Sequence, residues 1–130
     1  VPLAIDQELT KLDWEKTKTP LPFKVVVIKP ARIDVEKVVK YIDKYALKMV
    51  VTSSLDHAVG IAHACAVAAD LKKFYPNTLI DCGCLSMRAY RPNEFASRVL
   101  VTGPYLTNIQ GTGIGFDELL EKTNWTPVGK

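Results

Sequence analysis

Residues 23–30 read F-K-V-V-V-I-K-P, and this stretch decides the fold class. Its centre is a continuous apolar run, rich in β-branched residues, that ends at Lys29 and Pro30. A run of this kind is typical of a strand that is buried on both faces, as in a parallel sheet. We therefore expect residues 23–28 to form one strand of such a sheet.

Further strands and two helices are expected around this run. Residues 1–5, 48–52 and 78–80 are also short and apolar, which predicts three more strands. Asp34 precedes apolar residues spaced three and four apart, so it is the expected N-cap of an amphipathic helix. A second, alanine-rich helix is expected over residues 57–74. This alternation of strands and helices predicts βαβ units, a parallel sheet and right-handed crossovers.

The remaining segments carry weaker patterns. Residues 7–22 are polar, with a spacing of apolar residues that suits a short helix. Residues 98–102 are expected to form one more strand, and residues 117–122 a short helix. Residues 111–115 read G-T-G-I-G, which is not a full G-x-G-x-x-G. A flexible turn is therefore the better interpretation of this loop than a nucleotide-binding site.

Composition limits the classes of protein to consider. The 130 residues are 48% hydrophobic and 24% charged, which is typical of one globular domain. The net charge of +3 is small and the lysines are dispersed among acids, so neither nucleic acid nor a membrane surface is an expected partner. No apolar run reaches the roughly 20 residues that a membrane span needs. No signal-peptide pattern is visible either, so we expect a cytoplasmic protein, or a plastid one.

Two further features bear on the state of the chain. It contains three cysteines, an odd number that argues against a secreted disulfide framework. Cys82 and Cys84 form a C-x-C pair without a second cysteine or histidine pair, which disfavours a zinc site. The chain begins with Val1 on a strand-like segment, from which we expect it to be part of a longer polypeptide.

Polar residues stand at the carboxyl ends of all four expected strands. They are Asp6, Lys29, the trio Thr52, Ser53 and Ser54, and Asp81. In parallel α/β sheets and barrels, functional sites form outside these strand ends. Four consecutive strands that bring polar groups to one rim are more informative than any single residue.

Each group has a functional and a structural interpretation. Lys29 leaves a buried strand, so its amine can act in proton transfer, or its stem can simply carry the charge to solvent. Asp6 is either a ligand of Mg²⁺, which prefers oxygen, or a helix N-cap. Residues 52–54 offer hydroxyl and backbone N–H groups before a helix, which suits either carboxylate binding or capping. His57 and His63 have no ligand partners, and structural roles are expected for both.

Several segments resemble one known family. Residues 2–9 (P-L-A-I-D-Q-E-L), 25–30 (V-V-V-I-K-P) and 50–61 (V-V-T-S-S-L-D-H-A-V-G-I) are similar, in this order, to the C-terminal half of o-succinylbenzoate synthases. Residues 80–83 (I-D-C-G) resemble the L-D-T-G of the family's eighth strand, and residues 111–116 resemble its P-G-L-G tail. These enzymes belong to the enolase superfamily.

The resemblance implies a fold and a domain organisation. Residues 1–130 would form the C-terminal portion, about strands five to eight, of an enolase-superfamily (β/α) barrel with parallel strands. The N-terminal capping domain and the first half of the barrel would be absent. That half also carries the principal base, a K-x-K lysine. The chain is therefore expected to be inactive without the missing half as its partner.

The resemblance also implies a reaction and residue roles. The family carries out a Mg²⁺-dependent syn dehydration of 2-succinyl-6-hydroxy-2,4-cyclohexadiene-1-carboxylate to o-succinylbenzoate, in menaquinone and phylloquinone biosynthesis. By position, Asp6 would be one ligand of Mg²⁺, with two further ligands outside this chain, and Lys29 would be a catalytic barrel lysine. The substrate, a small-molecule carboxylate, would be bound by Thr52, Ser53, Ser54 and Asp81.

Some residues depart from the family pattern and leave alternatives open. Residues 6–8 read D-Q-E where D-E-S is usual, and residues 33–35 replace a usual Gly-Gly. Within the superfamily, the alternatives are a muconate cycloisomerase, a dipeptide epimerase and an N-acylamino-acid racemase. Asp81-Cys82-Gly83 lacks the D-x-D of dipeptide epimerases, which counts against that class. A non-catalytic α/β binding module is the alternative from another class.

Overall fold

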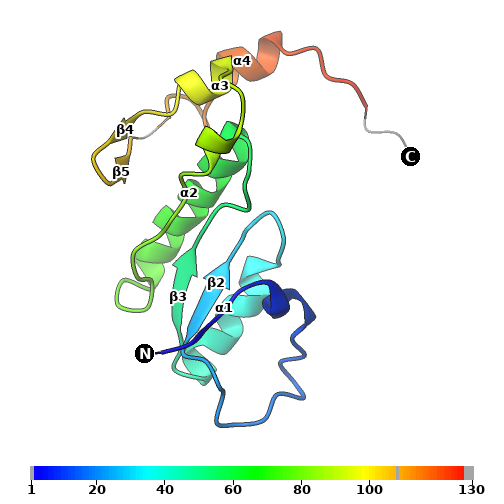
Figure 1. Ribbon diagram of the computed structural model, residues 1–130, viewed down its shortest axis with the longest axis vertical. Helices are drawn as coiled ribbons and strands as arrows, with labels where there is room; N and C mark the ends of the chain where they lie inside the picture. Colours follow the sequence, from blue (N-terminus) through cyan, green and yellow to red (C-terminus); the bar gives the residue numbers. More distant parts are fainter. Residues whose placement is uncertain (1, 108, 128–130) are drawn as a thin grey trace.

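A three-stranded parallel sheet organises the amino-terminal part of the chain. The computed structural model describes residues 2–107 and 109–127. Strands β1 (Ala4–Ile5), β2 (Val25–Ile28) and β3 (Lys48–Val51) follow one another in the sheet in chain order, as Figure 1 shows. Both pairings are parallel, with Ala4 beside Val25 and Val25 beside Lys48. The predicted parallel sheet is confirmed, with a shorter first strand than expected.

Two helices form the connections that the sequence predicts. Helix α1 (Val35–Lys44) follows β2, and its N-cap Asp34 accepts a hydrogen bond from the Lys37 amide at 3.0 Å. Helix α2 (Ala58–Phe74) follows β3. Its N-cap is His57, whose Nδ1 accepts from the Val59 amide at 3.5 Å, so this histidine has the structural role that we expected. Figure 1 shows α1 behind the strands.

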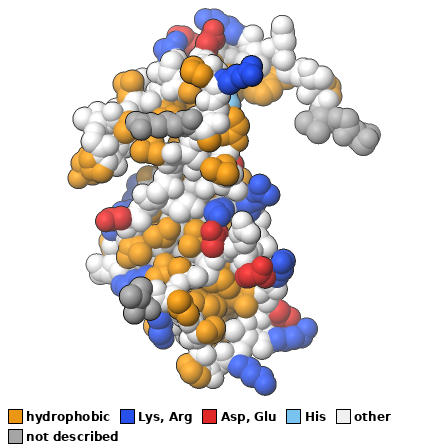
Figure 2. Space-filling view, in the orientation of Figure 1, with side chains coloured by type: hydrophobic (Ala, Val, Ile, Leu, Met, Phe, Trp, Pro, Cys, Tyr) orange, Lys and Arg blue, Asp and Glu red, His pale blue; other side chains and the backbone are white. Residues whose placement is uncertain are grey.

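The helices cover only one face of the sheet. Successive strand residues point to opposite faces. Val26, Ile28, Met49 and Val51 are 0% exposed and share one core cluster with residues of α1 and α2. Val25, Val27 and Val50 alternate with them and are only half-buried. Figure 2 shows hydrophobic side chains gathered on the visible face of the lower half of the molecule, over these strands. The sheet is thus apolar on both faces, although the helices cover one.

We predict that the covered face dominates the stability of the chain. Ile42 of α1 is 0% exposed, so Ile42→Ala should lower the free energy of unfolding by about 2–5 kcal/mol, through lost burial and a residual cavity. Lys40 on the same helix is exposed, and Lys40→Ala should change the free energy of unfolding by less than about 0.5 kcal/mol. Urea unfolding of both variants measures the difference. Equal shifts in the two midpoints would contradict this packing.

A short 3-10 helix and an aromatic stack fix the long connection between β1 and β2. The helix η1 (Gln7–Lys11) takes the place of the short helix expected in this polar segment. Trp14 is 4% exposed and stacks on Tyr41 of α1, with ring centroids 4.9 Å apart and planes 3° apart. Such stacking adds to the free energy of apolar burial. The connection is therefore held against α1.

The expected fourth strand over residues 78–80 is wrong as a continuous strand. Only isolated parallel bridges join it to β3, between Leu79 and Met49 and between Gly83 and Thr52. The two bridges are four residues apart between Leu79 and Gly83 but only three residues apart between Met49 and Thr52. The backbone of the longer segment therefore bulges between the bridges. Within this bulge, Cys82 Sγ accepts a hydrogen bond from the Val51 amide at 3.4 Å. The thiol thus replaces a ladder hydrogen bond.

The carboxyl-terminal part folds around the start of α2. It contains η2 (Met87–Ala89), α3 (Glu94–Ser97), an antiparallel hairpin of β4 (Val101–Thr102) and β5 (Tyr105–Leu106), and α4 (Asp117–Lys122), as Figure 1 shows. The helix over residues 117–122 is confirmed. The strand expected over residues 98–102 is wrong in its first half, because Arg98 is the C-cap of α3. Gly103, with φ of +58°, turns the chain into the hairpin. Among the described residues, no helix is long and apolar enough to cross a membrane.

Candidate functional site

Asp6 and Lys29 meet at the carboxyl ends of β1 and β2. The Lys29 ammonium lies 2.6 Å from one oxygen of the Asp6 carboxylate and 2.8 Å from the other. The lysine side chain is 20% exposed, so its charge is not simply carried to solvent. Asp6 occupies the N-cap position of η1, but its side chain makes no capping hydrogen bond. Asp6 therefore does not cap η1 through its side chain, and its carboxylate holds the Lys29 ammonium at the strand ends.

The sheet register explains why these groups come together. Ala4 lies beside Val25 and Ile5 beside Val26, so Asp6 comes level with Val27. Lys29 follows Val27 by two residues and therefore points to the same face, the one that the helices leave uncovered. Thr52 extends β3 beyond Val51, which is paired with Ile28, and so comes level with Lys29. One face of the sheet thus presents a carboxylate, an ammonium and a hydroxyl at its carboxyl edge.

The Thr52 hydroxyl is an unusual member of this group. Its oxygen is buried and has no hydrogen-bond partner among the described residues. The Thr52 amide is occupied, because it donates to the Ile28 carbonyl at 2.9 Å. A buried hydroxyl without a partner costs free energy. The oxygen is therefore an unsatisfied polar atom, enclosed by protein, at the carboxyl edge of the sheet.

The two serines are placed differently from the expected carboxylate-binding corner. Ser53 Oγ is 2.8 Å from Ser86 Oγ, and the Ser54 amide donates to the Asp56 carboxylate at 2.7 Å. Helix α2 begins only at Ala58, so residues 52–54 do not form its first turn. The backbone N–H groups of Thr52 and Ser54 are thus already used. What these residues still offer to a ligand is hydroxyl oxygen.

Arg32 joins the site, and the sequence reasoning missed it. Its Nε donates to Ser54 Oγ at 3.1 Å, and its amide closes a turn onto the Lys29 carbonyl at 2.8 Å. Its place three residues after Lys29 was visible in the sequence, but the turn that returns it to the strand end was not. The turn brings the guanidinium back over the strand end, where Arg can bind carboxylates through two parallel hydrogen bonds.

A cavity of about 390 Å³ contains most of these groups. Its charged lining residues are Asp6, Glu8, Lys11, Lys29 and Arg32. Lys11 pairs with Glu8 at 3.1 Å, and Lys29 pairs with Asp6. Arg32, hydrogen-bonded to Ser54, then adds a positive charge that these two ion pairs do not balance. The cavity is consequently suited to an anionic ligand such as a carboxylate.

Asp81 is not brought into this cavity. Gly83 is the residue bridged to Thr52, so Asp81 lies two residues before the edge of the sheet. The side chain is exposed and, within residues 2–107 and 109–127, makes no hydrogen bond or ion pair. Thr52 and Ser53 also lie outside the lining of the cavity. The structure therefore groups Asp6, Lys29 and Ser54 with Arg32 and leaves Asp81 apart.

The donor set fits one part of a magnesium site. Asp6 is a half-exposed carboxylate whose two oxygens face only the Lys29 ammonium, and carboxylate oxygen is the ligand that Mg²⁺ prefers. In the part of the chain that the structure describes, no three His, Cys, Asp or Glu side chains gather to hold a metal. The described residues could thus supply at most part of a metal site, of which Asp6 would be one ligand.

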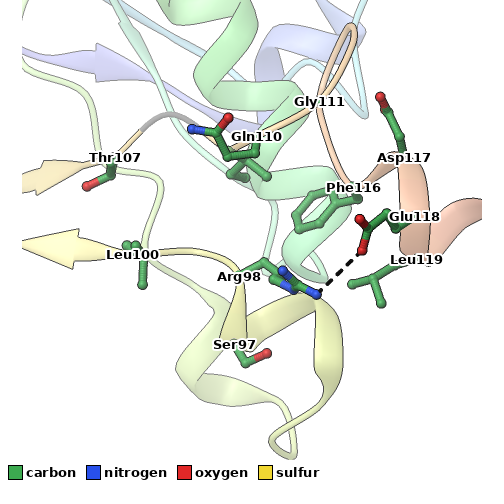
Figure 3. A pocket seen from close by; sticks show the side chains of 11 residues that line it. Ser97, Arg98, Leu100, Thr107, Gln110, Gly111, Phe116, Asp117, Glu118 and Leu119 are labelled. Atoms are coloured by element: carbon green, nitrogen blue, oxygen red, sulfur yellow. Dashed lines mark ion pairs between the residues drawn. The ribbon is translucent and has the colours of Figure 1, made fainter.

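A second cavity, of about 490 Å³, lies between α3, the hairpin and α4 (Figure 3). Its charged groups Arg98 and Glu118 approach each other to 3.9 Å. The Asp117 carboxylate accepts from the amide and the hydroxyl of Thr112. A Cβ added at Gly111 would come within 2.9 Å of Asp117, so only glycine fits there. The glycine-rich loop is thus closed by Asp117, which supports the turn interpretation.

Comparison with known proteins identifies a relative. No family model matches the chain. The chain is 45% identical over 123 residues to an o-succinylbenzoate synthase of Bdellovibrio bacteriovorus, a match that covers 95% of the chain. The match covers 37% of the relative, so the chain spans about a third of that protein's length. The resemblance inferred from the sequence is confirmed, as similarity to one part of such an enzyme.

Proposed function

We propose that this chain supplies the catalytic rim of an o-succinylbenzoate synthase barrel. The reaction would be the Mg²⁺-dependent syn dehydration of 2-succinyl-6-hydroxy-2,4-cyclohexadiene-1-carboxylate. The observation that carries the proposal is the Asp6–Lys29 pair at the adjoining ends of β1 and β2. It lies within a sequence that is 45% identical to such an enzyme.

Lys29 has the properties that the dehydration requires. Removal of the proton α to a carboxylate creates negative charge on the substrate. An ammonium that is 20% exposed can stabilise this charge or exchange a proton with the substrate. Asp6 would hold Mg²⁺ with ligands from outside the chain, and the bound ion would supply charge stabilisation at the substrate carboxylate. The two residues would then act on the same reacting group.

Arg32, Ser54 and Thr52 would bind and orient the substrate. The substrate carries two carboxylates, one on the ring and one on the succinyl arm. The Arg32 guanidinium, positioned by Ser54, suits one carboxylate. The Thr52 hydroxyl, which lacks a partner among the described residues, would make a second polar contact once the rest of the barrel completes the site. Asp81 remains a proposed substrate-binding residue, which would require a contribution from other parts of the barrel.

The uncovered face supports the proposal that a further barrel segment packs against this chain. Val25, Val27 and Val50 are apolar and half-buried on the face that also presents Lys29. β1 pairs with β2 on one side only, so its outer edge lacks a strand partner among the described residues. In a closed barrel, neither an exposed edge nor an open interior remains. We therefore propose the missing half, in the same or another polypeptide, as the partner of this chain.

A chimaera tests the proposed function. In it, this chain replaces the matching 37% of the Bdellovibrio relative, which restores a full-length polypeptide. We expect the folded chimaera to form o-succinylbenzoate when Mg²⁺ is present, and the 130-residue chain alone to form none. A folded chimaera without this activity would contradict the proposal. Racemisation of an N-acylamino acid in its place would favour the racemase alternative.

A further inference from the structure

Cys65 and Cys84 come from different elements and pack together beneath α2. Cys65 lies on the sheet-facing stripe of this helix, one turn after the fully buried Ile61. Cys84 follows the bulge beside β3, is 6% exposed, and its Sγ donates to the Val51 carbonyl at 3.8 Å. Cys65 packs against the core cluster that contains Cys84. Two thiols that are distant in the chain thus belong to the same core.

The two thiols differ in how easily a reagent in solution can reach them. Cys65 lines a cavity of about 380 Å³ between α2 and residues 106–107 and 109–114, so a small reagent can reach it. Cys84 is buried and can be reached only through its neighbours. Cys82 is exposed, and its Sγ is occupied by the hydrogen bond from the Val51 amide. Cys65 is therefore the thiol at which a small oxidant would react first.

The electrostatics support the same order of reaction. The interaction with the Cys84 thiol lowers the pKa of Cys65, which favours its thiolate, the nucleophilic form. The same interaction, together with burial, raises the pKa of Cys84 well above its usual range. Burial also raises the pKa of Cys82, which keeps that thiol protonated. Cys65 is thus the reactive thiol, and Cys84 is the protonated thiol next to it.

We propose that Cys65 and Cys84 form a site of reversible oxidation, at which a hydroperoxide converts the two thiols into an intramolecular disulfide. The Cys65 thiolate attacks the peroxide, the O–O bond breaks, and Cys65 becomes a sulfenic acid while the remaining oxygen leaves as water or alcohol. The Cys84 sulfur then attacks the sulfenic sulfur, and the S–O bond breaks. The thiol proton leaves with this oxygen as water. Two electrons pass from the thiols to the peroxide.

This bond would connect α2 to the segment beside the proposed substrate site. Ser86, two residues after Cys84, hydrogen-bonds to Ser53 at 2.8 Å. The disulfide would hold this segment against the helix. The inference rests on the packing of the thiols and does not depend on the proposed enzymatic activity. It therefore applies to the isolated chain as well.

The test is exposure of the reduced 130-residue chain to hydrogen peroxide, followed by alkylation with N-ethylmaleimide under denaturing conditions. We expect the monomer to lose about 2 Da, the mass of two hydrogens, and to accept one alkyl group instead of three. Cleavage after Lys and Arg places Cys65 in residues 49–72 and the other two cysteines in residues 74–88. A disulfide between these peptides is expected, and dithiothreitol should reverse it.

Serine variants identify which cysteine forms the disulfide with Cys65. Cys82→Ser is the matched control and should form the disulfide as readily as the original chain, whereas Cys65→Ser and Cys84→Ser should not form it. Cys65→Ala and Cys84→Ala provide second variants, and circular dichroism shows whether each chain remains folded. A disulfide that persists in a folded Cys84 variant would overturn the proposal. So would oxidation of Cys65 to a sulfinic acid without loss of the Cys84 thiol.

Discussion

Replacing Lys29 by alanine in the chimaera should reduce kcat for o-succinylbenzoate formation by roughly 10²–10⁴-fold, the range that general acid–base groups contribute. The loss follows from the position of the lysine, whose ammonium lies at the carboxyl edge of the uncovered face of the sheet. No other described cation pairs with Asp6, so none is placed to take over this charge. The measurement is the steady-state rate of product formation at saturating Mg²⁺ and substrate.

Lys24 offers the matched control for this variant. It precedes the same strand β2, is exposed, and lies at the opposite end of the sheet. Lys24→Ala removes the same side chain and the same charge, and should leave kcat within about twofold, which corresponds to less than about 0.5 kcal/mol. Equal losses in the Lys24 and Lys29 variants would show that the effect is one of folding or net charge.

Replacing Asp6 by asparagine should weaken Mg²⁺ binding and lower the activity of the chimaera at limiting Mg²⁺. The amide keeps the shape of the carboxylate but loses the negative charge that attracts the ion. Removal of residues that only support a metal ligand typically costs about 10–100-fold in affinity or activity, and loss of a ligand itself should cost at least as much. Isothermal titration with Mg²⁺, together with activity against Mg²⁺ concentration, measures both effects.

Asp43 supplies the control for the charge change. It is an exposed residue of α1, away from the strand ends, so Asp43→Asn changes net charge by the same amount. The activity of the Asp43→Asn chimaera should depend on Mg²⁺ concentration in the same way as that of the original chimaera. An Asp6→Asn protein with unchanged Mg²⁺ affinity would exclude Asp6 as a ligand, even if its rate were reduced.

The parts of the fold that the sequence predicts well are those governed by local patterns. The apolar run ending at Lys29 contains β2, and the spacing of apolar residues after Asp34 gave both α1 and its cap. Asp117–Lys122 forms the short helix that its sequence predicts. In α1, hydrophobic periodicity and the Asp34 cap favour the same structure.

The errors arise where distant contacts decide the backbone. Residues 78–80 are apolar enough for a strand, but a bulge interrupts the pairing and Cys82 takes a ladder hydrogen bond. Residues 98–102 have strand-like composition, yet Arg98 caps α3 and only Val101–Thr102 form a strand. No local pattern records these events, because each depends on packing against β3 or α2.

The candidate site shows the same division. Asp6 and Lys29 could be placed together from the sequence, because both follow parallel strands that were expected to be neighbours. Arg32 could not, because its position depends on the turn that follows β2 and on the contact with Ser54. The Ser54 amide is held by a local contact instead, since it donates to the Asp56 carboxylate two residues later.

A double-mutant cycle of Asp6→Asn and Lys29→Ala in the chimaera tests most directly whether these residues form one catalytic site. The two side chains are 2.6 Å apart and are proposed to act on the same reacting group, so their effects should not be independent. We predict that the double variant loses little more activity than the more damaged single variant. Losses that simply multiply, or single variants as active as the Lys24 and Asp43 controls, would contradict a shared site.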